Sequence, residues 1–138
     1  MTIPTTIVFH GMTPSAWIEE EISGRVAKLG RHSRAPTSCR VVFDVPHRHH
    51  ESGNRFSIRI DLRVPGDTIA VTRASNVHAV GQDLDASAWA KQFEIDGMRK
   101  DVRVVVRDAF TVARRRLQEH ARKRIAVITK KRRRSDAA

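Results

Sequence analysis

The chain has 138 residues, with 26 Lys and Arg against 15 Asp and Glu, a net charge of +11. This length suits one domain with a buried core and a short additional segment. A single cysteine excludes an internal disulfide framework, and the first residues lack the pattern of a secretory signal. No apolar run approaches the roughly 18 residues needed to cross a bilayer, so we expect a cytoplasmic protein without a membrane anchor.

The first 30 residues predict one strand and one helix. Residues 5–10 are β-branched and apolar, which is typical of a strand. A helix should follow, with Thr13 as its N-cap, Pro14 at its first position and Gly30 at its end. Its buried face is predicted from apolar residues at three- and four-residue steps, namely Ile18, Ile22, Val26 and Leu29.

Three further strands are expected at residues 38–45, 55–64 and 68–73. The middle one alternates strictly between apolar and polar side chains, which predicts an antiparallel strand with one buried and one solvated face. Cys39 falls on the apolar side of its strand, so we interpret it as a core residue and not as a nucleophile.

Residues 74–100 predict an irregular insertion, with a short helix considered over 86–93. Its Asn, Gly and Asp residues are typical of loops, whereas Leu84, Trp89, Phe93 and Ile95 are too apolar for a solvated linker. Two interpretations stay open: a surface excursion that packs its aromatic residues on the domain, which we favour, and a binding loop.

A long basic helix is predicted from Asp101, the expected N-cap, towards the C-terminus. Residues 102–138 hold 13 Lys and Arg against 3 Asp and Glu, so nearly all the excess positive charge lies there. The predicted buried stripe is Val102, Val105, Val106, Ala109, Phe110, Ala113 and Leu117. Another side of the same helix carries Arg103, Arg107, Arg114, Arg115 and Arg122.

Segregated positive charge favours a polyanionic partner, because each neutralised phosphate releases counterions. The helix dipole explains basic residues near a helix C-terminus, but it does not explain Arg103 and Arg107 in the first turns. The sequence therefore predicts nucleic-acid binding through phosphates and RNA shape. No aromatic stacking is evident on the basic face, and sequence-specific readout is not expected.

Catalytic chemistry is not indicated. The histidine cluster at 47–50 matches no established metal-ligand spacing, and the chain has no phosphate-binding glycine motif. We therefore expect no enzyme activity, no catalytic or metal site, no cofactor and no small-molecule substrate.

The predicted fold class is α+β, in the order β-α-β-β-β-α, with a four-stranded sheet and both helices packed on one face, similar to a double-stranded-RNA-binding fold. The domain should span residues 1–125, with the insertion at about 74–100, and residues 126–138 should form a basic C-terminal tail.

This pattern resembles the ribosome hibernation-promoting factor and ribosome-associated inhibitor A family, also called sigma-54 modulation proteins. The order of elements is similar, as is the run from Arg25 to Leu29 (RVAKL). In the second helix, residues 108–110 (DAF), 113–115 (ARR) and 115–117 (RRL) are similar as well. The resemblance covers about residues 5–73 and 101–124.

The resemblance implies a factor that binds the small subunit of the bacterial ribosome and the 70S ribosome. It would lie on 16S rRNA in the decoding channel and exclude mRNA and tRNA during stress or stationary phase. The resemblance marks Arg25, Lys28, Arg115 and Lys123 as RNA-facing residues. Helical geometry adds Arg103, Arg107, Arg114 and Arg122, and Arg31 at the end of the first helix completes the predicted set.

Departures from the family leave other functions open. The tyrosine typical of the second helix is missing, residues 74–100 are longer than usual, and no C-terminal dimerisation domain is seen. One alternative is a general RNA- or DNA-binding module that uses the basic helix and tail and is not specific for ribosomes. Another is a stress protein that binds a protein partner through residues 74–100.

Overall fold

The computed structural model describes residues 3–31, 36–45, 55–76, 91, 93 and 96–136. These residues form a four-stranded sheet and two long helices, and the elements follow the predicted β-α-β-β-β-α order, so the predicted α+β fold is confirmed. The elements are β1 (Thr5–His10), α1 (Ala16–Leu29), β2 (Ser38–Asp44), β3 (Arg55–Val64), β4 (Asp67–Asn76) and α3 (Asp96–Asp136).

The strands lie in the order β1-β2-β3-β4, with β1 parallel to β2 and the other pairs antiparallel. A parallel pair needs a long crossover, which α1 provides, whereas β3 and β4 are joined by a two-residue turn. In that turn Pro65 precedes Gly66, whose φ of 80° is a conformation that glycine adopts without strain. Gly11 also has a positive φ, and a Cβ there would lie 1.9 Å from the Val45 carbonyl oxygen.

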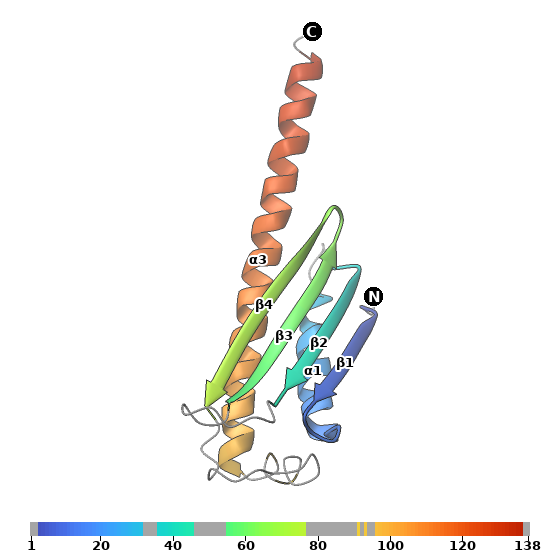
Figure 1. Ribbon diagram of the computed structural model, residues 1–138. Coiled ribbons are helices and arrows are strands. Elements are labelled where there is room, and N and C mark those ends of the chain that lie inside the picture. Colours follow the sequence, from blue (N-terminus) through green and yellow to red (C-terminus); the bar gives the residue numbers. More distant parts are fainter. Residues whose placement is uncertain are drawn as a thin grey trace.

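Both helices cover the same face of the sheet and leave the other face open (Figure 1). All predicted stripe residues of α1 and α3 are buried between helices and sheet. On β3 the apolar residues of the alternation are buried, and Arg59 and Arg63 are exposed. The strict alternation in the sequence therefore identified the core face correctly.

Phe93 connects the predicted insertion to this core. Its ring is fully buried and stands edge-on to those of Phe43 and Phe56, with centroids 5.4 Å away in both cases. This part of the segment packs on the domain, as the favoured interpretation expected. Residues 77–90, 92, 94 and 95, which include Trp89 and most of the helix considered at 86–93, lie outside the described residues.

Several predicted element ends are wrong, and the end of β2 and the start of β4 differ by one residue each. The N-cap of α1 is Ser15 and not Thr13, because the first helical hydrogen bond joins the Glu19 amide to the Ser15 carbonyl at 3.0 Å. Helix α3 starts at residue 96, so Asp101 lies inside the helix. Burial of Met98 explains this earlier start, since it adds one more apolar contact to the stripe.

Strand β4 is longer than the predicted 68–73, because it pairs with β3 along its whole length, from Val64↔Asp67 to Arg55↔Asn76. The ladder hydrogen bonds outweigh the low strand propensity of Ala74, Ser75 and Asn76.

Helix α3 extends well beyond the sheet (Figure 1). Among the side chains that the structure describes, Leu117 is the last buried one of α3, yet the helix continues without a break across residue 125, where the tail was predicted, to Asp136. Two arginines of α3 attach it to the sheet edge and the turn: Arg116 donates to the Ala70 carbonyl, and Arg124 donates to the Pro65 carbonyl at 3.3 Å. In the described part of the chain, no helix is long and apolar enough to cross a membrane.

Candidate nucleic-acid interface

A groove of about 310 Å³ runs between α1 and α3, and we call it the basic groove. Its floor is apolar, because Leu29 and Phe110 belong to the two core stripes. Five cationic side chains line its walls: Arg25, Lys28 and Arg31 from the α1 side, and Arg107 and Arg114 from α3. Residues three, four or seven positions apart share one side of a helix, so Arg25 and Lys28 lie on one side of α1 and Arg107 and Arg114 lie on one side of α3.

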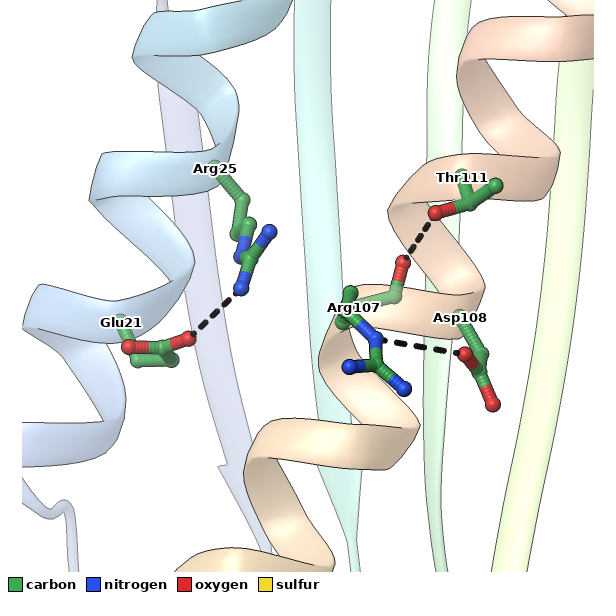
Figure 2. A network of polar contacts seen from close by, with 5 residues as sticks. All are labelled: Glu21, Arg25, Arg107, Asp108 and Thr111. Atoms are coloured by element: carbon green, nitrogen blue, oxygen red, sulfur yellow. Dashed lines mark hydrogen bonds and ion pairs between the residues drawn. The ribbon is translucent and has the colours of Figure 1, made fainter.

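In the described part of the chain, two of these five cations pair with a carboxylate. Arg25 contacts Glu21 on its own helix at 3.4 Å, and Arg107 contacts Asp108 at 3.7 Å (Figure 2). Both pairs are at least partly exposed to water, where such pairs contribute little and exchange readily. The Thr111 hydroxyl donates to the Arg107 carbonyl at 2.8 Å. The basic groove therefore presents a strong positive field that a polyanion could neutralise.

The structure brings together five of the nine residues predicted to contact RNA. Of the other four, Arg103 lies one turn before Arg107 on α3, and its side chain is exposed. Arg115, Arg122 and Lys123 are also exposed on α3 but do not line the basic groove. Contact of any of the nine residues with RNA stays a prediction.

Sequence reasoning missed an aromatic residue beside this surface. The half-buried Trp17 ring on α1 lies 5.2 Å from the Arg99 guanidinium and 6.0 Å from that of Arg103, distances typical of cation–π contacts. Trp17 is two helical turns before Arg25 and therefore on the same side of α1, a spacing that was visible in the sequence. Arg103 thus contacts α1 in addition to facing solvent.

The interior contains one thiol, at Cys39. Burial, and secondarily the negative charge of Asp61, raise the pKa of Cys39 to about 12. The thiol therefore stays protonated at neutral pH. Its burial confirms the interpretation of Cys39 as a core residue. Within the described residues no group of three or more potential ligands could hold a metal ion, and the histidine cluster at 47–50 lies outside them.

Two solved structures have a similar fold. A ribosomal subunit interface protein from Coxiella burnetii has a TM-score of 0.58 and 10% identity, over 86% of this chain and 98% of that one. The N-terminal domain of Protein Y from Thermus thermophilus has a TM-score of 0.50 and 12% identity, over 87% of this chain and 99% of the other. At these identities the similarity shows the fold alone.

The sequence has no significant match among curated proteins. A match to a family as a whole is more informative. The sequence model of the family described as Sigma 54 modulation protein / S30EA ribosomal protein matches residues 5–125, which include every described strand, α1 and the part of α3 that packs on the sheet. The chain therefore belongs to this ribosome-associated family.

Proposed function

We propose that this protein is a ribosome hibernation factor that binds the small ribosomal subunit. In this proposal α1 and α3 lie against 16S rRNA in the decoding channel and occupy the space of mRNA and tRNA, so idle ribosomes are silenced during stress or stationary phase. The protein would act in the cytoplasm, where ribosomes are. The observation that carries the proposal is the basic groove, found in a chain of this family.

The chemistry of the basic groove suits an RNA backbone. Arginine side chains bind phosphate oxygens through several N–H donors, and two facing rows of cations can contact phosphates on both sides of one strand. Contacts of this kind recognise shape and charge and not base sequence, as a blocker of many different mRNAs would require. The inhibition would be steric, so it needs no catalytic residue.

The proposal can be tested by sucrose-gradient sedimentation with vacant 70S ribosomes and separated subunits at near-physiological salt. We expect the wild-type protein to sediment with the small subunit and the 70S ribosome. The double variant Arg107→Glu/Arg114→Glu should stay at the top of the gradient. A matched control is Arg40→Glu/Arg63→Glu, which makes the same charge change at exposed positions on the open sheet face. This control should sediment like the wild type.

Competition with mRNA and tRNA then tests where on the small subunit the protein binds. Addition of mRNA and initiator tRNA should displace the protein from the small subunit if the decoding channel is its site. Sedimentation that mRNA and tRNA do not affect would exclude this site. Equal loss of binding in both double variants would assign the effect to net charge, and binding that follows bulk RNA or DNA would favour the general nucleic-acid-binding module.

A further inference from the structure

Exposed aliphatic side chains gather on the part of α3 that extends beyond the sheet. Ile125, Val127 and Ile128 are 46%, 53% and 46% exposed. Together with Val104 they are the large hydrophobic residues exposed in the described part of the chain. Single exposed aliphatic residues are common on protein surfaces, but Ile125 and Ile128 are three residues apart, share one side of α3 and form a small patch.

Two apolar hollows lie beside this patch, between α3 and the β3–β4 turn. One has a volume of about 390 Å³ and the other of about 360 Å³. Both are bordered by Pro65, His120 and Arg124, and the bond from Arg124 to the Pro65 carbonyl lies between helix and turn. We call the two hollows together the turn groove, whose apolar lining is Val64, Pro65, Leu117, Ala121, Val127 and Ile128.

The turn groove continues the core stripe of α3. Ala113 and Leu117 are buried under the sheet, and Ala121, Ile125 and Ile128 follow at steps of four and three residues. The stripe thus has the spacing of a helix face that packs on a partner. From residue 118 onward, however, the described part of the chain buries no side chain of α3.

The net charge of residues 118–136 indicates which kind of partner suits the turn groove. Residues 118–136 hold eight Lys and Arg against two Asp and Glu. A second copy of this helix would bring the same excess of positive charge, so the partner should be acidic. RNA is acidic too, but it binds proteins through phosphate contacts and stacking on aromatic or arginine planes, for which Val127 and Ile128 offer nothing.

We propose that the turn groove, with the exposed aliphatic patch beside it, docks an acidic protein segment that carries its own aliphatic side chains. Those side chains would fill the two hollows, and flanking carboxylates would pair with Arg124 and the cations further along α3. This surface lies between α3 and the β3–β4 turn and shares no lining residue with the basic groove, so the two sites could be occupied together.

Two synthetic peptides of equal length and charge test this proposal in 0.15 M salt by fluorescence anisotropy. One carries Leu and Ile at three- and four-residue steps between glutamates, and the other has Ser at those positions. We expect the full-length protein to bind the aliphatic peptide at least tenfold more tightly. The variant Val127→Ser/Ile128→Ser should lose this preference, whereas Val104→Ser, which removes an exposed aliphatic side chain elsewhere on α3, should keep it.

Other outcomes would overturn the proposal. Equal affinity for both peptides would mean that charge alone binds them. An affinity for single-stranded RNA that falls in Val127→Ser/Ile128→Ser but not in Val104→Ser would assign the surface to RNA. A dimer in sedimentation equilibrium that the double variant abolishes would assign it to a second copy. None of these measurements uses ribosomes, so they stand apart from the test of ribosome binding.

Discussion

The two halves of α3 carry the same kind of pattern but have different surroundings. Residues 102–117 and 118–136 both combine aliphatic residues at helical spacing with many cations. The first half buries its apolar stripe against the sheet, and the second half leaves it exposed. Periodicity therefore predicts which side of a helix can be buried, but only the neighbouring elements decide whether it is.

Thiol reactivity should show the largest difference between the protein interior and the second half of α3, residues 118–136, which we call the extension. Burial raises the pKa of Cys39 to about 12 from an ordinary value of 9.0, so at pH 8 its thiolate fraction is about a thousandfold lower than that of a free thiol. A cysteine introduced by Ile128→Cys should react with iodoacetamide at the rate of an exposed thiol. Mass spectrometry of labelled peptides measures both rates in one sample, and similar rates would contradict the burial of Cys39.

The same pKa difference predicts a pH effect on stability. The folded protein holds the Cys39 proton more tightly than the unfolded chain does. The protonated thiol therefore makes its full contribution to the free energy of unfolding below pH 9, and this contribution is lost as the pH rises towards 12. Urea unfolding of the wild type and of Cys39→Ala between pH 8 and 10.5 measures it. The stability of the wild type should fall more steeply with pH than that of the variant.

We expect Leu117 and Ile125, two turns apart on one stripe, to contribute unequally to the free energy of unfolding. Leu117→Ala removes a buried side chain and should lower the free energy of unfolding by about 2–5 kcal/mol. Ile125→Ala removes an exposed one and should change it by less than about 0.5 kcal/mol. Urea unfolding followed by circular dichroism measures both, and equal losses would show that the extension is packed in solution.

The arginines of the two halves should differ in their contribution to RNA binding. Arg107→Gln/Arg114→Gln removes two cations of the basic groove and should lower the salt dependence of RNA affinity, as a log–log slope, by about 2. Arg132→Gln/Arg133→Gln removes the same charge from the extension and should lower the slope by less than about 1. Filter binding between 50 and 300 mM salt gives both slopes, and a larger effect in the extension would move the RNA site there.

Substitutions that lower helix propensity should have the smallest effect on stability, and they should again affect the first half of α3 more than the second. Ala126→Gly reduces helix propensity at an exposed position by about 1 kcal/mol and should leave the unfolding midpoint of the domain unchanged. Ala109→Gly makes the same change at a fully buried position and should lower that midpoint. Amide hydrogen exchange should locate the effect of Ala126→Gly in residues 118–136 alone.

Much of this fold could be predicted because periodicity is a local signal. The stripe from Ile18 to Leu29 and the alternation in β3 each required only one segment of sequence. The start of α3 could not be predicted in this way, because it depends on contacts with distant segments, such as the burial of Met98.

The same distinction applies to the candidate site. That both helices are basic was visible in the sequence, but the helix packing decides that Arg31 and Arg107 line one groove while Arg115 does not. The contact of Trp17 with Arg99 and Arg103 likewise joins residues more than eighty positions apart, so no local pattern indicates it.

The length of α3 affects how the protein meets a polyanion. At about 1.5 Å per residue, residues 118–136 reach about 28 Å past the last buried turn. The Debye length at physiological ionic strength is about 8 Å, so cations on this projecting helix act on an approaching surface that the domain's own charges cannot reach. The projecting helix therefore increases the distance at which the protein attracts a polyanion. Shortening this helix should slow association more than it speeds dissociation.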